Sequence, residues 1–117
     1  MDTTTLRREA ACRVSGALDT AFLRALCEPV RADILTRMIQ IGRADVATIA
    51  APFDQDRSVI SRHLQILRDA GVVFADQDGR HVYYEIDGPA VLARLRSLTL
   101  EIGALVATCC PGPGGRP

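Results

Sequence analysis

The sequence predicts a mainly helical α+β domain, and three observations support this fold class. Alanine and leucine are abundant, whereas the 117 residues include only three phenylalanines, two tyrosines and no tryptophan, a composition that favours helices. Apolar residues recur at helical spacing through most of the chain. One Asp-Gly step, Asp78-Gly79, lies between two stretches rich in β-branched and aromatic residues, which is a strong signal for a β-hairpin.

Composition excludes several classes of protein. Fourteen arginines balance fourteen acidic residues, and the hydrophobic share of 48% is that of one folded domain. No apolar run approaches the ~20 residues of a membrane-spanning helix, and the N-terminus lacks the features of a secretion signal. We therefore expect a cytoplasmic protein with no membrane partner and with four reduced cysteines. Because net charge is zero, nucleic-acid binding would have to rest on local clusters.

Helical periodicity runs through the first half of the chain. Residues 6–26 carry one helical stripe, and Ser15-Gly16 is a candidate break into two helices. The pattern restarts at Pro29, which suits a first helical position, and ends at Gly42. A short helix is predicted over residues 45–51.

The best-defined helix follows this short helix, with Asp54 or Asp56 as its cap and Gly71 as its end. Its buried stripe is predicted to be Val59, Ile60, Leu64 and Leu67. Its other face carries polar and basic side chains, namely Ser58, Ser61, Arg62, Gln65 and Arg68. A hairpin comes next, with strands over residues 72–77 and 80–86 joined by the Asp78-Gly79 turn.

Pro89 opens the last helix, which is predicted to run to about Ala107. Five of its apolar residues are spaced 4, 3, 4, 3, as in a helix–helix seam: Val91, Leu95, Leu98, Ile102 and Leu105. Further apolar residues lie outside that seam, more than one contact face requires. We therefore favour a homodimer interface over burial of this helix within one monomer.

A short helix, a tight connection, a helix with a polar outer face and a hairpin form the plan of a winged helix-turn-helix. The second helix enters the major groove, where short polar or arginine side chains reach base edges. Arg57 suits a phosphate contact at the helix start, and Arg80 suits a contact from the wing. The alternative is a solvated helix face with ordinary charges, since three aspartates dilute the positive charge there: Asp54, Asp56 and Asp69.

Three segments carry a family resemblance. Residues 57–73, RSVISRHLQILRDAGVV, are similar to the pattern S-x-V-S-x-H-L-x-x-L-x-x-A-G-L-V. Residues 25–35, ALCEPVRADIL, are similar to A-L-x-D-P-x-R-x-x-I-L, and residues 78–84, DGRHVYY, to G-R-x-x-Y-Y. These patterns, in this order, belong to the ArsR/SmtB family of metal-responsive repressors, which the chain resembles over residues 21–86.

The resemblance implies a homodimeric winged helix of order α-α-α-α-β-β-α, with the first and last helices at the interface. It implies a repressor, not an enzyme, that binds a dyad operator on double-stranded DNA and is released by an inducer. Residues 1–110 are then the DNA-binding and dimerisation domain, and residues 111–117 a disordered tail. The DNA contacts implied by position are Arg57, Ser58, Ser61, Arg62, His63 and Gln65, with Arg80 from the wing.

The cysteines point to the inducer. The cysteine motif that some family members carry before the recognition helix is absent. The set of histidines and acids that others carry on the last helix is absent too, since that helix has one acid, Glu101, and no histidine. Cys109 and Cys110 end the last helix, as in some arsenic-responsive members, but the further cysteine of those members is missing. Thiolates select soft ions, so we expect As(III) or Sb(III), held by this pair and by Cys12 from the other subunit.

Alternatives stay open for the cysteines. Cys12 lies roughly 200° from the apolar stripe of its helix, which argues against a core position but also fits a free surface thiol. Hg(II) or another soft ion is a second candidate inducer, and a thiol-redox or persulfide sensor could use the same cysteines. Cys27 is expected to be a buried small hydrophobic residue. Neither Cys-x-x-Cys nor a phosphate-binding loop is present, so no enzymatic activity is expected.

Overall fold

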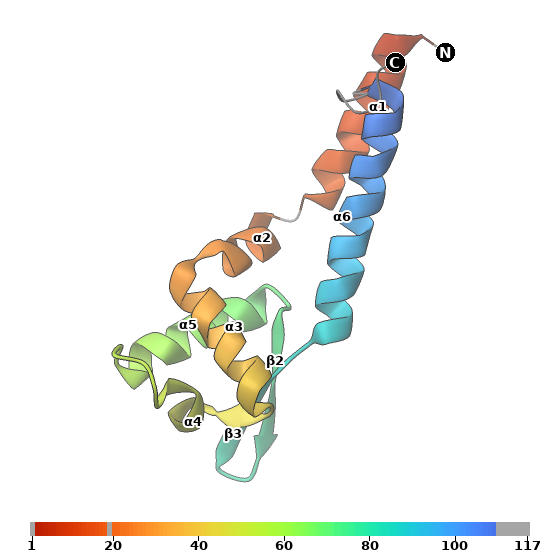
Figure 1. The fold of residues 1–117 in the computed structure, drawn as a ribbon. Helices are drawn as coiled ribbons and strands as arrows, with labels where there is room; N and C mark the ends of the chain where they lie inside the picture. The colour runs from red at the N-terminus through yellow and green to blue at the C-terminus, as the bar shows by residue number, and fades with distance from the viewer. Residues whose placement is uncertain (1, 19, 110–117) are drawn as a thin grey trace. The chain divides into compact units, whose positions relative to one another are not determined.

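The computed structural model describes residues 2–18 and 20–109 (Figure 1). The chain divides into two compact units, and each is considered by itself. The central unit spans Thr20–Val91, and the terminal unit joins the segment before Thr20 to the segment from Leu92 onward. No helix of the described segments is long and apolar enough to cross a membrane.

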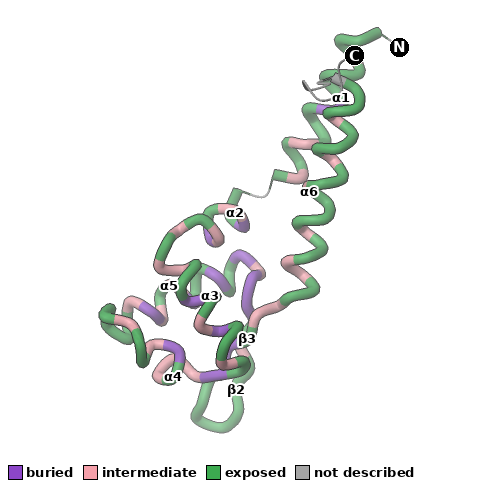
Figure 2. Tube along the Cα trace, in the orientation of Figure 1, coloured by how far each residue is buried: buried purple, intermediate pink, exposed green. Residues whose placement is uncertain are grey.

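The central unit packs four helices against a small antiparallel sheet with strand order β1-β3-β2. Its core is formed by buried residues of α2, α3, α4 and α5 and of the sheet, among them Phe22, Ile34, Ile49, Leu64 and Val73. Figure 2 marks the buried positions along the chain in purple. Its elements are α2 (Thr20–Cys27), α3 (Pro29–Ile41), β1 (Ala44–Asp45), α4 (Val46–Ala50), α5 (Arg57–Asp69), β2 (Val73–Asp78) and β3 (His81–Ile86).

Helix α3 begins and ends where the sequence predicts. Pro29 takes the first helical position, and the carboxylate of Glu28 accepts a hydrogen bond of 2.8 Å from the backbone N–H of Arg31. Gly42 follows the helix with φ 74° and ψ −151°, a backbone conformation that is essentially restricted to glycine. An added Cβ at Gly42 would meet no atom within 4 Å. Backbone conformation, and not space, therefore makes glycine necessary there.

Two features of the chain order were not predicted correctly. The first predicted helix does not divide at Ser15-Gly16, because Gly16 remains within α1 (Thr3–Ala17) and α2 begins at Thr20. Strand β1 was missed, and its two residues pair with Tyr84 and Tyr83 of β3. The order is therefore α-α-α-β-α-α-β-β-α, with one helix and one strand more than the order that the family resemblance implies.

The hairpin turn lies one residue later than predicted. Asp78 and His81 form the last cross-strand pair, so Gly79 and Arg80 are the two turn residues. Gly79 has φ 64°, and no described residue other than glycine has positive φ. This sign pattern matches a type II′ turn, which takes glycine at its first central position. Arg80 therefore lies at the tip of the wing.

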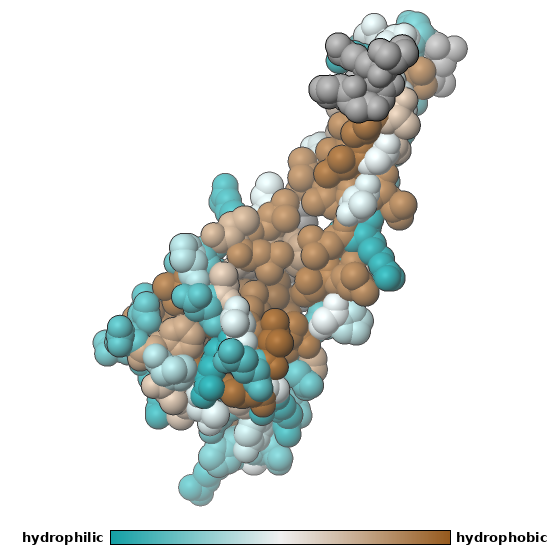
Figure 3. Space-filling view, viewed as in Figure 1, coloured by the Kyte–Doolittle hydropathy of each residue, from teal (hydrophilic) through white to brown (hydrophobic). Residues whose placement is uncertain are grey.

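The terminal unit pairs α1 with α6 from Leu92 onward, which is most of the 22-residue helix α6 (Gly88–Cys109), and the two lie side by side (Figure 1). Arg13 and Glu101 join them through an ion pair of 3.4 Å, and Ala10 is buried. Many large apolar side chains stay exposed on this unit (Figure 3): Leu6, Leu92, Leu95, Leu100, Ile102 and Val106. Leu100 is 72% exposed. Two helices alone thus leave much of their apolar surface in water.

Candidate nucleic-acid interface

Helix α5 has one polar face and one buried face, as the sequence predicts. Ile60, Leu64 and Leu67 are each 0% exposed and fix the helix on the core. Val59, predicted in the same stripe, is only half-buried. The opposite side presents four exposed side chains and the half-buried Ser61; the exposed four are Arg57, Ser58, Arg62 and Gln65. Gln65 donates a hydrogen bond of 2.8 Å to Asp69, one turn further along. The structure thus brings five of the six candidate contacts of α5 onto one accessible surface.

The start of α5 carries no side-chain cap. Asp56 occupies the N-cap position, one of the two predicted, but its carboxylate makes no capping hydrogen bond. Its carbonyl oxygen instead accepts from the backbone N–H groups of Val59 and Ile60, at 2.9 and 3.1 Å. The first turn of α5 is therefore held by backbone bonds alone, with Arg57 exposed beside it.

Arg43 braces the wing, a role that sequence reasoning missed. Its Nη2 lies 2.9 Å from Oδ2 of Asp76 in β2, and its guanidinium stacks 4.3 Å from the ring centre of Tyr83 in β3. Asp76 and Tyr83 are cross-strand partners, so the Arg43 side chain contacts both strands of the hairpin. The register of the hairpin was the available signal, because it places an acid opposite an aromatic residue. The brace steadies the strands that carry Arg80.

His63 points differently from the other candidate contacts. Its side chain is 19% exposed, and its Nδ1 lies 3.2 Å from Nη1 of Arg31 and 4.0 Å from Oε2 of Glu28. Both partners belong to the start of α3. The structure thus places the imidazole against the start of α3, although the family resemblance implies that His63 contacts DNA.

Two acidic N-caps make the central unit sensitive to acid. The backbone N–H of Arg31 lowers the pKa of Glu28, and hydrogen bonds from the side chain and backbone of Thr48 lower the pKa of Asp45. A lowered pKa adds stability above the unfolded-state value of about 4 and loses it as the pH falls through the folded-state pKa. We expect the melting temperature to fall below about pH 4, and to fall less steeply in Asp45→Asn, which keeps the cap without titrating. Parallel melting curves of both proteins from about pH 6 to pH 3 check this, and equal slopes would contradict it.

The structure describes one side chain of the three predicted inducer ligands. Cys12 is exposed on α1, in keeping with its predicted place off the apolar stripe. The side chain of Cys109, all of Cys110 and the predicted tail 111–117 lie outside the described residues. Within the described part of the chain, no group of three or more histidine, cysteine or acidic side chains could hold a metal ion.

The prediction that Cys27 is buried was wrong. Cys27 ends α2 and is exposed. Helix α2 buries Phe22 and Ala25, and a residue two positions after Ala25 lies roughly 200° away around the helix. The same geometry that buries Ala25 therefore turns Cys27 toward solvent.

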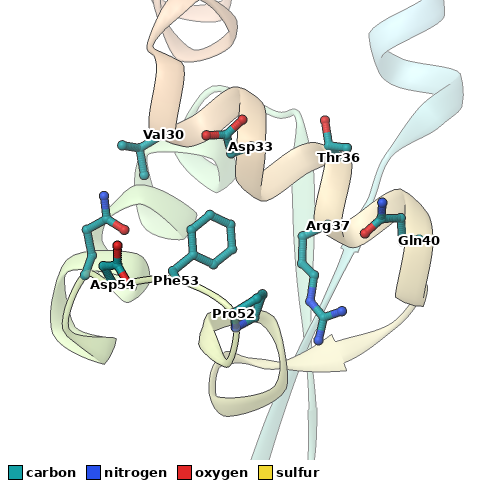
Figure 4. A pocket seen from close by; sticks show the side chains of 9 residues that line it. Val30, Asp33, Thr36, Arg37, Gln40, Pro52, Phe53 and Asp54 are labelled. Atoms are coloured by element: carbon teal, nitrogen blue, oxygen red, sulfur yellow. The ribbon is translucent and has the colours of Figure 1, made fainter.

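A groove of about 450 Å³ lies between α3 and the loop before α5 (Figure 4). The ring of Phe53 occupies its middle, and Asp33, Arg37 and Asp54 contribute charges of both signs. Nη2 of Arg37 donates 3.0 Å to the carbonyl of Thr48, while its Nε is buried without a hydrogen-bond partner. This mixture of charges does not favour binding of a phosphate backbone, so the groove lies outside the candidate interface.

Comparison with known proteins identifies the fold and its relatives. Residues 26–73 match the family model of a helix-turn-helix domain. The probable mercury resistance operon repressor of Streptomyces lividans is 32% identical over 99 residues, which cover 80% of this chain and 78% of that protein.

Two solved structures share the architecture. The crystal structure of a possible transcriptional regulator for arsenical resistance is 38% identical, has a TM-score of 0.59, and is matched over 74% of this chain and 93% of that one. The crystal structure of an ArsR family transcriptional regulator is 25% identical with a TM-score of 0.65, over 76% of this chain and 90% of that one.

Proposed function

The chain belongs to the ArsR/SmtB family of winged helix-turn-helix transcriptional regulators, and we propose that it is a metalloid-responsive repressor. It binds operator DNA as a homodimer and leaves the DNA when As(III) or Sb(III) binds its cysteine thiolates. Such regulators are not enzymes. The observation that carries the proposal is the two-sided α5, whose buried face fixes the helix while its arginine and serine face stays accessible.

Helix α5 reads the major groove in this proposal. Ser58 and Arg62 approach base edges, because a small hydroxyl allows close contact and a guanidinium can donate two hydrogen bonds to guanine. Arg57 contacts phosphate at the start of the helix, and Ser61 and Gln65 complete the surface. Arg80, at the wing tip, contacts the backbone or the adjacent minor groove.

The exposed apolar side chains of the terminal unit support a homodimer. Leu92, Leu95 and Leu100 line a largely apolar hollow on α6, and all three are exposed. Covering such a surface removes apolar area from water, at about 25 cal/mol per Å². A second copy of α1 and α6 presents the same residues, so a two-fold interface is self-complementary. That symmetry matches a dyad operator with half-sites about one helical turn apart.

Soft-ion chemistry supports the inducer. Cys109 and Cys110 stand next to each other in the sequence, and thiolates prefer thiophilic ions. Relatives named for arsenical and mercury resistance share the fold. A third thiolate from Cys12 of the other subunit would join α1 of one copy to α6 of its partner. If only a dimer that is poorly spaced for DNA forms this site, inducer binding shifts the population away from the operator.

Fluorescence anisotropy on the chain's own promoter DNA tests this proposal, under anaerobic conditions at fixed salt, because affinity for DNA depends on salt. We expect arsenite to weaken binding by about 5- to 150-fold, the range of a coupling free energy of about 1–3 kcal/mol. Cys109→Ser, Cys110→Ser and Cys12→Ser should each abolish this release without changing affinity in the absence of arsenite. Cys27→Ser is the matched control, because it removes an exposed thiol outside the predicted site.

The outcomes separate the alternatives. Unchanged release in Cys109→Ser contradicts the cysteine-pair site, and unchanged release in Cys12→Ser contradicts the ligand from the other subunit. A complex that ignores arsenite but dissociates with Hg(II) points to a mercury sensor. One that dissociates with peroxide instead points to a thiol-redox sensor. Failure of the protein to bind promoter DNA at all would remove the repressor proposal.

A further inference from the structure

One arginine joins three helices of the central unit. Arg31 lies in the first turn of α3, and its Nε and Nη2 donate to the carbonyl oxygens of Ala25 and Arg24, at 2.9 and 3.1 Å. These carbonyls belong to the last turn of α2, where helices leave acceptors unsatisfied. The remaining arm, Nη1, lies 3.2 Å from Nδ1 of His63 in α5. The end of α2, the start of α3 and the middle of α5 thus meet at one guanidinium.

The chemistry of this contact fixes the state of the imidazole. A guanidinium has only donors and stays charged in proteins. Nη1 of Arg31 must therefore donate, and Nδ1 of His63 must accept. An accepting Nδ1 requires a neutral imidazole with its proton on Nε2. A protonated imidazole would direct an N–H group at the guanidinium and would lose this hydrogen bond.

Glu28 lies close to both Arg31 and His63. Its Oε2 accepts 2.8 Å from the backbone N–H of Arg31 and lies 4.0 Å from Nδ1 of His63. A protonated His63 would therefore find an attractive partner in Glu28 and a repulsive one in Arg31. From α2 the nearby charge is Arg24, and from α5 it is Asp69, which line one groove with Arg31.

We propose that Arg31 and His63 are positioning residues for DNA recognition: the hydrogen bond from Nη1 to the neutral imidazole locks α5 against α2 and α3. His63 acts through Nδ1 and does not contact DNA. Base-edge hydrogen bonds demand accurate placement of the helix, so this hydrogen bond sets where α5 presents Ser58 and Arg62, which lie on a different face of the helix from His63. The inference rests on the proposed DNA-binding role of α5.

A pair of amide substitutions distinguishes positioning from direct contact. The side-chain oxygen of asparagine can take the place of Nδ1, whereas the amide of glutamine reaches the place of Nε2. We expect His63→Asn to bind promoter DNA within about threefold of wild type and His63→Gln to bind about tenfold more weakly, as for loss of a hydrogen bond to a charged group. Melting curves confirm that both variants are folded. Retained binding in His63→Gln with loss in His63→Asn overturns the proposal, because it shows that Nε2 contacts DNA. Equal affinities of the two variants, weak or strong, overturn it too.

The pH dependence of wild-type binding gives an independent readout. We expect affinity for promoter DNA to fall as the pH is lowered, because a protonated imidazole offers no acceptor at Nδ1. His63→Asn should lose this fall, whereas His81→Asn, which changes the only other histidine of the chain, should keep it. A wild-type affinity that does not fall, or a fall that survives in His63→Asn, overturns the proposal. Absence of wild-type binding at about pH 8 would instead count against the proposed function itself.

Discussion

Replacing Leu64 with alanine is expected to lower the free energy of unfolding by about 2–5 kcal/mol. Leu64 is 0% exposed in the middle of α5, within the core that also holds Ile34 and Ile49. Truncation removes buried methyl groups and leaves a cavity that the surrounding helices can close only in part. Because domains of this size are marginally stable, the loss is a large part of the whole. Urea denaturation followed by circular dichroism measures it.

The control for this substitution is Arg68→Ala, in the last turn of the same helix. Arg68 is exposed, and surface substitutions usually change stability by less than about 0.5 kcal/mol. Both substitutions introduce alanine, which favours helix. The difference between their effects on the free energy of unfolding therefore reports the contribution of the buried Leu64 side chain. A loss below about 1 kcal/mol in Leu64→Ala would contradict the packing described for α5.

Arg62→Ala is expected to weaken binding to the operator by about 1–3 kcal/mol, or roughly 5- to 150-fold. Arg62 is exposed on the polar face of α5, one turn after Ser58, where a guanidinium can reach a guanine edge. Loss of a base contact should also relax the preference for operator over unrelated DNA. Anisotropy titrations with both DNAs, at two salt concentrations, measure affinity and preference together.

Arg68→Ala serves here as a charge-matched control. It removes the same positive charge from the far end of the same helix, so both variants lower the net charge of α5 by one. We expect Arg68→Ala to keep the preference for operator. If both variants weaken binding to operator and unrelated DNA alike, Arg62 contributes only charge and does not read sequence.

Local signals account for the parts of the fold that the sequence predicts well. Helix α3 is bounded by Pro29 and Gly42, and α5 has a long apolar stripe. Neighbouring residues are therefore enough to predict where these two helices lie. Strand β1 is only two residues long, and its pairing with Tyr83 and Tyr84 depends on a segment far along the chain. The wing turn moved by one residue because the turn could use Gly79 as its first or its second central residue.

In the candidate site, too, some features follow from neighbouring residues and others from residues far apart in the sequence. Periodicity alone predicts which side of α5 is exposed, and the burial of Ile60, Leu64 and Leu67 bears this out. The contact of Arg31 with His63 joins positions 32 apart, and that of Arg43 with Asp76 joins positions 33 apart. No pattern within one helix specifies such contacts. The direction of the His63 imidazole therefore emerges only from the folded chain.

The two-residue turn between β2 and β3 limits how the hairpin can be lengthened by insertions. Gly79 and Arg80 close the hairpin directly onto the pair Asp78–His81, and side chains alternate between the two faces of each strand. One inserted residue would move every later side chain of its strand to the opposite face and would separate Tyr83 from Arg43. Two residues added to each strand preserve both faces and move the tip outward by about 6–7 Å. Hairpins of this kind therefore keep the faces of their side chains only when they lengthen by two residues per strand.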